Sequence, residues 1–182
     1  KAILASLEQA YIVEALAAEN GGRGFQWATQ REDRERLWKA RHDSNPATRA
    51  MRPGAAMFVT DACVPISALA DNMTAARADG DASFLKFKIN GHVGDGNFHV
   101  SYLVMPDAEE EVAEAKRLAE NVVMRALESG GTASGEHGVG LGKLKYLRRE
   151  HGNGIEVMGA LKLALDPHGI MNPGKLGMSA TL

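Results

Sequence analysis

The sequence predicts an α+β fold in which a ferredoxin-like antiparallel sheet has helices packed mainly on one face. Two observations lead to this prediction. Residues 84–103 contain two runs of alternating apolar and polar side chains around a Gly-Asp-Gly turn, which is the pattern of an antiparallel β-hairpin. Stretches of helical periodicity lie before and after the hairpin, so helices and strands are interleaved along the chain. Because no internal repeat or low-complexity linker divides the 182 residues, we expect one domain over 1–182.

The elements before the hairpin are predicted from periodicity and from the positions of Gly and Pro. Leu37 and Trp38 are the apolar anchors of a highly charged helical stretch, and we expect Trp38 to lie in the core. Pro46 and Pro53 interrupt the chain after that stretch. The expected elements, in order, are a helix over 1–19, a short strand over 25–28, a charged helix over 30–40, a buried strand over 57–59 and a helix that begins at Pro65.

A long amphipathic helix should follow the hairpin. Asp107 and Glu110 have the spacing of a capping box, and an apolar stripe continues behind them to Ala126. Gly130 and Gly131 mark the end of this helix. Beyond it we expect a glycine-rich loop over 134–142, a helical region over roughly 143–165 and a tail that contains Asn172 and Lys175.

Two histidines of the hairpin are predicted to lie on the same face of the sheet. Side chains alternate along a strand, so if Phe98 faces the core, His99 and the partner strand's His92 face away from it. With a four-residue turn over 93–96, His92 would lie opposite Asn97 and about 7–8 Å from His99 at the backbone. Two imidazoles at that separation can bind one metal ion if a third ligand, such as a carboxylate, comes from elsewhere. The alternative is a pair of solvent-exposed histidines near a turn.

A second group of reactive side chains lies in the glycine-rich loop, where Glu136 and His137 stand between glycines. Such a pair can divide labour, one residue as a ligand and the other as an acid or base. The alternative is that Glu136 merely favours the N-terminus of the next helix. Gly142-Lys143 lacks the spacing of a nucleotide-binding P-loop, and the turn over 94–96 joins two strands and opens no helix, so neither predicts a phosphate site.

Composition excludes several classes of function. The chain carries 21 basic and 23 acidic residues, a net charge of −2, which gives no electrostatic reason to expect nucleic acid or a membrane surface as a partner. The single cysteine, Cys63, excludes an intrachain disulfide framework and a cysteine-rich zinc ribbon. No apolar run approaches the length of a membrane span.

Five segments together resemble the C-terminal domain of the FAD-linked oxidases of the vanillyl-alcohol-oxidase superfamily. Their order and spacing are similar over residues 20–177, and the first two segments look most like cytochrome-linked D-lactate dehydrogenases. Glycolate oxidase subunits and D-2-hydroxyglutarate dehydrogenases are close relatives. The segments are LWKARH (37–42), TDACVPIS (60–67), GHVGDGNFH (91–99), SGEHGVG (134–140) and MNPGK (171–175).

The resemblance implies a division of labour, in which an upstream domain holds most of the FAD and this domain covers the flavin and supplies the substrate site. A 2-hydroxyacid would lose its hydroxyl proton to a histidine base while the flavin performs the redox step. By motif match, the implied roles are metal ligation by His92, His99 and Glu136, with Zn²⁺ or Mn²⁺ as the ion, general base for His137, substrate contact for Asn97, carboxylate binding for Arg41, and a place near the flavin ring for Asn172 and Lys175.

The expected pocket wall departs from the family pattern in two places. Aromatic residues that relatives often carry after the Arg-His pair are replaced by polar and small ones over 43–49. Relatives selective for larger diacids tend to have a lysine where Val59 and Thr60 stand. This difference favours a small monocarboxylate such as lactate, and Arg52 is an alternative partner for its carboxylate. For either Arg41 or Arg52 the alternative role is a solvated surface charge.

We therefore expect the substrate domain of an FAD-dependent D-lactate dehydrogenase that passes electrons to a cytochrome-type acceptor. Because the chain begins inside a helical pattern with Lys1, we interpret it as a fragment that is inactive and flavin-free alone. The expected partners are the upstream FAD domain and a 2-hydroxyacid. No nucleic acid is expected, and the sequence leaves open whether the chain forms a homodimer. The expected location is the cytoplasm, or the periphery of the inner membrane. A non-catalytic ferredoxin-like ligand-binding module is the alternative of another class.

Overall fold

The computed structural model describes residues 2–175, with side chains from Ser6 onward. The chain forms two units, Lys1–Thr48 and Arg49–Leu182, and each is described by itself. None of the described helices combines the length and the apolarity that crossing a membrane requires. The strands and the candidate functional cluster all belong to the second unit, so the second unit is the one that positions the site.

The first unit contains α1 (Ala2–Glu19), α2 (Arg31–His42) and the beginning of α3 (Ser44–Ala50). The strand expected over 25–28 is absent, and the Trp27 ring instead packs edge-on against Tyr11, with 5.5 Å between ring centroids. The prediction that Trp38 is buried is also wrong, since its side chain is 54% exposed. The physical reason is that α2 is charged around its circumference and buries no residue.

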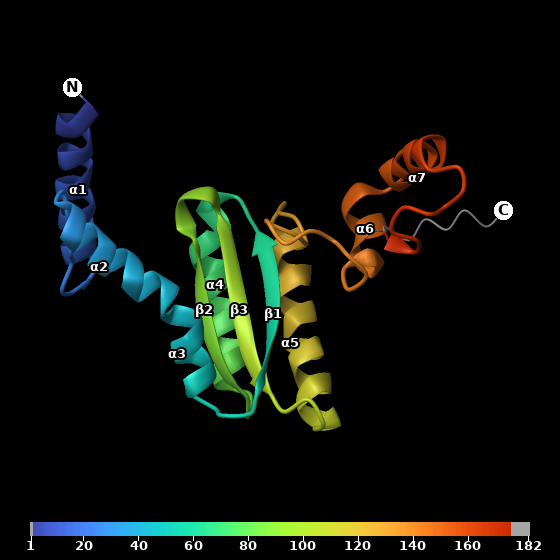
Figure 1. Cartoon of the computed structure of the whole chain (residues 1–182), viewed down its shortest axis with the longest axis horizontal. Helices are drawn as coiled ribbons and strands as arrows, with labels where there is room; N and C mark the ends of the chain where they lie inside the picture. Colours follow the sequence, from blue (N-terminus) through green and yellow to red (C-terminus); the bar gives the residue numbers. More distant parts are fainter. Residues whose placement is uncertain (1, 176–182) are drawn as a thin grey trace. The chain divides into compact units, whose positions relative to one another are not determined.

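The second unit is built on a three-stranded antiparallel sheet in the order β1-β3-β2, as Figure 1 shows. The strands are β1 (Ala56–Cys63), β2 (Lys86–His92) and β3 (Asn97–Val104). A single 3₁₀ turn over Val93–Asp95 and the positive φ of 74° at Gly96 connect β2 to β3. His92 pairs with Asn97 and Asn90 pairs with His99, which confirms the predicted register.

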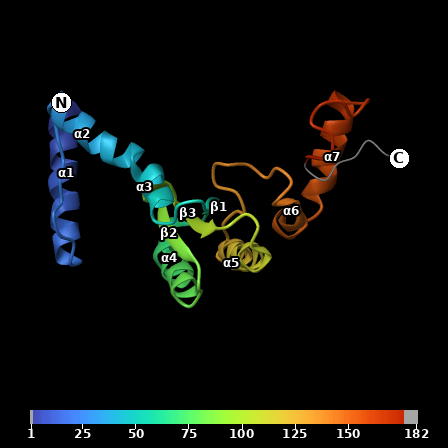
Figure 2. The same cartoon turned by 60° about the horizontal axis from the view of Figure 1, so that its bottom comes forward.

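Two helices, α4 (Ile66–Asp81) and α5 (Glu109–Glu128), cover the same face of the sheet, as the two views of Figures 1 and 2 show. This arrangement confirms the predicted α+β class. Alternate residues of β3 point into the layer between sheet and helices, where Tyr102 and Val100 are fully buried. Apolar burial of this kind stabilises by about 25 cal/mol per Å². The core of this layer also contains Ala62, Leu69, Ala76, Phe98, Leu118 and Val122.

The element order β-α-β-β-α corresponds to the first five elements of the ferredoxin-like pattern. Where that pattern continues with a fourth strand, the described residues form only one antiparallel bridge, between Cys63 and Thr132. The glycine-rich loop starts directly after this bridge, so the chain crosses the edge of β1 at the level where the strand ends. The loop is thereby brought beside the face of the sheet that α4 and α5 leave open.

Three local predictions near the helices need correction. The capping box is wrong, because α5 begins at Glu109 with Ala108 as its N-cap and no side chain caps it. The helical region expected over 143–165 is two helices, α6 (Leu144–His151) and α7 (Gly154–Leu165), separated at Gly152, where φ is 52°. Pro46 does not interrupt the chain but lies in the first turn of α3, where the missing N–H removes no helical hydrogen bond.

Candidate metal and substrate site

The two hairpin histidines lie beside each other on the open face of the sheet. His92 is the last residue of β2 and His99 is the third residue of β3. Their ring centroids are 5.7 Å apart and the rings are nearly perpendicular, at 82°. The side chain of His99 is 7% exposed and that of His92 is 38% exposed. The hairpin therefore presents one buried and one accessible imidazole to the same space.

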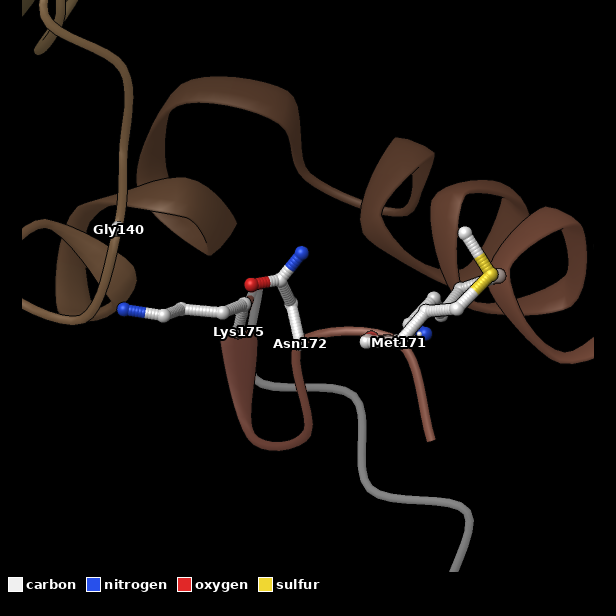
Figure 3. Close-up of a pocket in the computed structure, with 5 residues that line it drawn as sticks. Gly140, Met171, Asn172 and Lys175 are labelled. Atoms are coloured by element: carbon white, nitrogen blue, oxygen red, sulfur yellow. Dashed lines mark hydrogen bonds between the residues drawn. The ribbon is translucent and has the colours of Figure 1, made fainter. Parts of the chain in front are cut away.

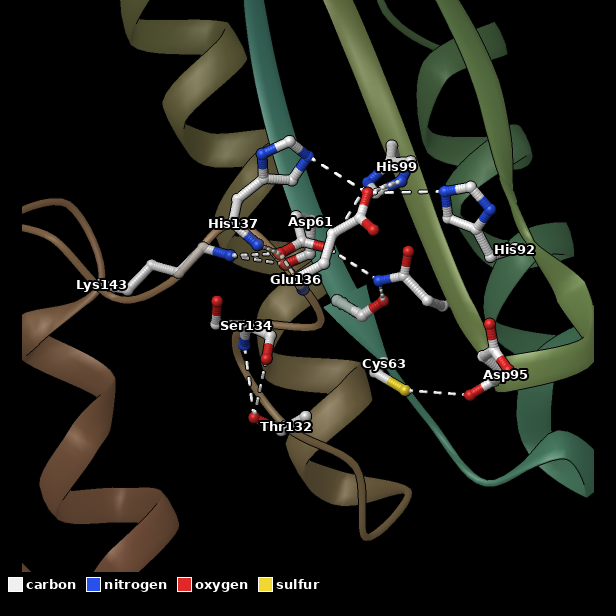
Figure 4. Close-up of polar contacts among 12 residues, drawn as sticks. Asp61, Cys63, His92, Asp95, His99, Thr132, Ser134, Glu136, His137 and Lys143 are labelled. Carbon is white, nitrogen blue, oxygen red and sulfur yellow. Dashed lines mark hydrogen bonds and ion pairs between the residues drawn. The ribbon is translucent and has the colours of Figure 1, made fainter.

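The carboxylate of Glu136 enters this space from the glycine-rich loop. Its Oε1 lies 3.1 Å from Nε2 of His99 and 3.5 Å from Nε2 of His92. One ligand atom from each of these three residues lies within 4.8 Å of the other two. Figure 4 shows the carboxylate directed between the two rings. Two imidazole nitrogens and a carboxylate oxygen are a ligand set suited to Zn²⁺ and compatible with Mn²⁺, so the residues present fit a divalent metal.

His137 follows Glu136 in the loop and lies on the other side of the same carboxylate (Figure 4). Its Nε2 is 3.5 Å from Oε1 of Glu136, and its ring centroid is 5.2 Å from that of His99. The side chain is 59% exposed, so a small molecule in solution can reach it. A histidine that lies beside the candidate metal ligands and is open to solvent has the position that a general base requires.

Asp61, on β1, is a buried carboxylate beneath the cluster and is 2% exposed. Its Oδ2 accepts the backbone N–H groups of Glu136 and His137, each at 3.1 Å. Its Oδ1 accepts Nδ2 of Asn97 at 2.7 Å. The Nζ of Lys143 is 3.5 Å from Oδ2 and donates to the backbone oxygen of Asp61 at 2.7 Å. A network of this kind provides the hydrogen bonds that a buried carboxylate needs.

Burial and hydrogen bonding shift the pKa values of this network in a consistent way. Burial raises the pKa of Asp61, but the hydrogen bonds from the His137 backbone and from Asn97, with the nearby Lys143, outweigh it and hold that pKa below its usual range. Burial also lowers the pKa of His99, against the opposing effect of Asp61 and Glu136. An ionised carboxylate therefore lies beside a neutral imidazole at neutral pH, and neutral imidazole is the form that binds metals.

Asn97, predicted to contact substrate, is brought next to the cluster but faces inward. It is 5% exposed, and its Nδ2 donates to both Asp61 and the backbone oxygen of Ala62. Its Oδ1 is buried and has no hydrogen-bond partner among the described residues. In this structure the amide of Asn97 therefore orients the carboxylate of Asp61 through a hydrogen bond.

The two arginines considered for the substrate carboxylate lie in different surroundings. Arg41 is on α2 in the first unit, where its guanidinium lies over the Trp38 ring, 5.2 Å from the centroid. Arg52 forms two hydrogen bonds of 2.7 Å to the carboxylate of Glu111 and one of 3.1 Å to the backbone oxygen of Leu103. Arg52 is thus engaged in holding the end of β3, which removes it as the alternative carboxylate partner.

Asn172 and Lys175, predicted to lie near the flavin, line a hollow of about 420 Å³ in the second unit (Figure 3). Gly140 and Lys162 contribute to the same hollow, so the glycine-rich loop borders both this space and the histidine cluster. Asn172 adopts a positive φ of 48°, unusual outside glycine. The buried carboxylate of Asp166 fixes this turn by accepting two backbone N–H groups at 2.9 Å and pairing with Lys162.

Sequence reasoning missed two members of the network, Asp61 and Lys143. In the sequence, Gly142-Lys143 shows only that a nucleotide-binding loop is absent there, and Lys143 follows Asp61 by 82 positions. A signal for Asp61 was present, because a carboxylate between Thr60 and Ala62 interrupts a buried strand. A charge in such a place is rarely left without partners.

Comparison with known proteins shows the family to which the chain is similar. A family model for FAD linked oxidases, C-terminal domain, matches residues 3–176. A probable mitochondrial D-lactate dehydrogenase of Danio rerio is 46% identical over 170 residues, 93% of this chain and 34% of that protein. A mitochondrial cytochrome D-lactate dehydrogenase of Arabidopsis thaliana is 44% identical over 93% of this chain and 30% of that protein.

Two further matches are more distant. The glycolate oxidase subunit GlcD of Bacillus subtilis is 34% identical over 90% of this chain and 35% of that protein. Among solved structures, a 4-ethylphenol oxidase from Gulosibacter chungangensis in complex with isoeugenol matches with a TM-score of 0.57 and 19% identity. The match covers 84% of this chain and 32% of that chain, and it supports the fold alone. The chain spans about a third of the length of these relatives. Since the family model covers nearly every residue, this chain belongs to the C-terminal domain family of the FAD-linked oxidases.

Proposed function

We propose that this chain is the substrate-side domain of an FAD-dependent D-2-hydroxyacid dehydrogenase that oxidises D-lactate to pyruvate. The observation that carries the proposal is the convergence of His92, His99 and Glu136, with His137 beside them, on a domain of the FAD-linked oxidase family. Relatives at 44–46% identity are named D-lactate dehydrogenases, which supports D-lactate as the substrate.

The residues of the cluster divide the chemistry between them. His92, His99 and Glu136 would hold Zn²⁺ or Mn²⁺, which supplies a Lewis acid for the substrate's hydroxyl oxygen. His137 takes the hydroxyl proton at Nε2, the nitrogen that faces the cluster. FAD, bound mainly by the remaining part of the protein, supplies the two-electron acceptor for the hydrogen that leaves Cα. Proton and electron pair thus leave the substrate by separate routes.

Substrate binding and flavin contact complete the proposal. Arg41 binds the substrate carboxylate through its planar pair of N–H donors. Asn172 and Lys175 would contact the flavin at the hollow that they line with Gly140. For Asn97 the hydrogen bonds favour support of Asp61 over direct contact with substrate.

The proposed reaction also needs an FAD-binding domain and an electron acceptor. Relatives are about three times as long, so the domain 1–182 is proposed to need an FAD-binding domain and to be inactive and flavin-free without it. The electron acceptor is proposed to be a cytochrome, as the printed name of the Arabidopsis thaliana relative states for that protein. The expected cytoplasmic or inner-membrane-peripheral location belongs to the same proposal.

A substrate panel on the full-length protein tests the activity. We expect kcat/KM for D-lactate to exceed that for glycolate and D-2-hydroxyglutarate by at least about tenfold, a difference of about 1.4 kcal/mol. Glycolate is the second candidate, because a glycolate oxidase subunit is 34% identical. Equal or greater turnover of either competitor would contradict the assignment to D-lactate.

Elemental analysis of the same protein tests the metal site. We expect about one equivalent of a divalent metal in the wild type and none in the His92→Ala and Glu136→Ala variants. The matched controls are His151→Ala and Glu156→Ala, on α6 and α7, which should retain the metal. A wild type that takes up no Zn²⁺ or Mn²⁺, even after incubation with either ion, would refute the proposed role of the cluster.

A further inference from the structure

A single buried carboxylate, that of Asp61, connects the two parts of the cluster. Asp61 lies opposite His99 in the β1–β3 register, and both residues occupy the open face of the sheet. Glu136 lies in the glycine-rich loop, 37 positions after His99 in the sequence, and reaches the hairpin only through side-chain contacts. Asp61 contacts both the loop backbone and the His99 ring.

One oxygen of Asp61 faces the loop. Oδ2 accepts the N–H groups of Glu136 and His137, each at 3.1 Å. The loop can come this close because position 135 has no side chain: a Cβ on Gly135 would lie 1.8 Å from Nδ2 of Asn97 and 2.9 Å from Oδ1 of Asp61. Two charge-assisted backbone hydrogen bonds therefore fix the segment that carries both the carboxylate and the second histidine.

The other oxygen of Asp61 faces the hairpin. Oδ1 lies 3.4 Å from Nδ1 of His99, and this nitrogen is buried without a hydrogen-bond partner among the described residues. A metal-binding histidine almost always donates its second ring N–H to a carboxylate, a carbonyl or a water, which fixes its tautomer and orientation. The unpartnered Nδ1 of His99, directed at an ionised carboxylate, is arranged for such a bond.

Lys143 balances the charge of this carboxylate. Its side chain is 16% exposed, and its Nζ is 3.5 Å from Oδ2 of Asp61. The lysine and the aspartate together are neutral, so the charge of a bound divalent cation is offset only by Glu136. The pair thus lets a buried anion orient the ligands without cancelling the attraction for the substrate.

We propose that Asp61 is the positioning residue of the metal site, holding the Glu136–His137 loop with one oxygen and the His99 ring with the other. This inference rests on the proposed function, because it presupposes that His92, His99 and Glu136 bind a divalent metal. Asp61 is not one of the three candidate ligands and acts through its contacts with the loop backbone and with His99.

The test compares Asp61→Asn with Asp79→Asn in the full-length protein. Asp79 is the matched control, since its carboxylate is also partly buried and accepts hydrogen bonds from an asparagine, Asn121, and a cation, Arg125. The readouts are Zn²⁺ affinity by competition with a chelator, the visible absorption of the Co²⁺ form, and the melting temperature. We expect Asp61→Asn to weaken Zn²⁺ binding by about 10- to 100-fold. It should also alter the Co²⁺ spectrum, while Asp79→Asn leaves both within twofold of wild type.

Each outcome has a distinct meaning. A wild type that binds no Zn²⁺ or Co²⁺ refutes the proposed function and this inference together. A wild type that binds metal while Asp61→Asn keeps its affinity within about twofold, with an unchanged Co²⁺ spectrum, refutes the inference alone. Losses of equal size in Asp61→Asn and Asp79→Asn would also refute it, because they would report stability and not positioning.

A second pair of variants covers the case in which Asp61→Asn fails to fold. Gly135→Ala should push the loop away from Asp61 and weaken Zn²⁺ binding by at least about tenfold. Gly142→Ala is its control in the same loop, since a Cβ at Gly142 meets nothing within 4 Å. Equal Zn²⁺ affinity in the two variants would overturn the proposal.

Discussion

The two parts of the candidate site are held in different ways. The hairpin part, with His92 and His99, is fixed by the continuous pairing of β2 with β3 and by the core under β3, where Phe98 is 1% exposed. The loop part, with Glu136 and His137, has no such support; it lies in irregular chain rich in glycine and is tied to the sheet through Asp61. The hairpin part carries two of the candidate metal ligands, and the loop part carries the third and one further histidine.

The difference shows which parts of a site a fold can specify locally. Alternation of side chains along β3 places His99 opposite to Phe98 without any distant contact. The position of Glu136 depends on a side chain 75 residues away in the sequence. We therefore expect changes in the buried core of the hairpin to affect folding, and changes in the loop to affect ligand binding while the fold persists.

The largest expected effect is on folding, from the hairpin. Phe98→Ala removes a fully buried ring and should lower the free energy of unfolding by about 3–5 kcal/mol. The measurement is urea unfolding followed by circular dichroism. Phe84→Ala is the control, because Phe84 is 61% exposed and its loss should cost less than about 0.5 kcal/mol. Similar losses in both variants would show that the hairpin core is not where the structure places it.

The next effect is on metal binding, from the loop. Glu136→Gln keeps the shape of a half-exposed side chain but removes its charge, and should weaken Zn²⁺ binding by about 100-fold, or about 2.7 kcal/mol. The melting temperature of the metal-free protein should stay unchanged. Glu156→Gln, on α7, should affect neither quantity. If Glu136→Gln instead destabilised the metal-free protein as much as Phe98→Ala, the distinction between the two parts would be lost.

A smaller effect separates two glycines of the hairpin. A Cβ at Gly91 would lie 2.4 Å from the backbone oxygen of Asn97 and 2.7 Å from Cα of Phe98, whereas at Gly94 it meets nothing within 4 Å. Gly91→Ala should therefore lower the free energy of unfolding by about 1–3 kcal/mol, and Gly94→Ala should leave it nearly unchanged. Urea unfolding of the pair measures this directly; a reversed order would mean that the strands are paired in another register.

The smallest effect concerns the far end of β3 and depends on pH. Hydrogen bonds from Arg52, and from the backbone of Met105, lower the pKa of Glu111. A lowered native pKa contributes stability that is present above the pKa of the unfolded state and is lost as the pH falls through the native value. Glu111→Gln should therefore lower the melting temperature at pH 7, with a difference from wild type that shrinks as the pH falls below the usual pKa of a glutamate and through the lowered native one. Exposed Glu109→Gln is the control, and a pH-independent difference would contradict this account.

Predictability from sequence follows the same division. The α+β class and the hairpin register could be predicted because period-two alternation is a local signal. Trp38 was predicted wrongly because an aromatic residue on a charged helix gives no information about what covers it. The split of the last helical region at Gly152 was missed, although glycine there adopts a positive φ that other residues avoid.

The site was predictable only as a set of candidate residues. The family resemblance pointed to His92, His99 and Glu136, and the structure brings these three together. It gave no role to Asp61 or Lys143, because their contribution comes from contacts across 75–82 positions that no periodicity encodes. The sequence allowed Arg52 to bind the substrate carboxylate, but its guanidinium donates hydrogen bonds to the carboxylate of Glu111, 59 positions later.

The central claim is that imidazoles from two neighbouring strands and a loop carboxylate bind one metal ion. The most direct measurement is anomalous diffraction at the zinc edge from crystals of the full-length protein grown with Zn²⁺. We predict one strong peak about 2.0–2.2 Å from His92 Nε2, His99 Nε2 and a Glu136 oxygen. Ordered side chains with no peak among them, or a peak that any one of the three does not reach, would contradict the claim.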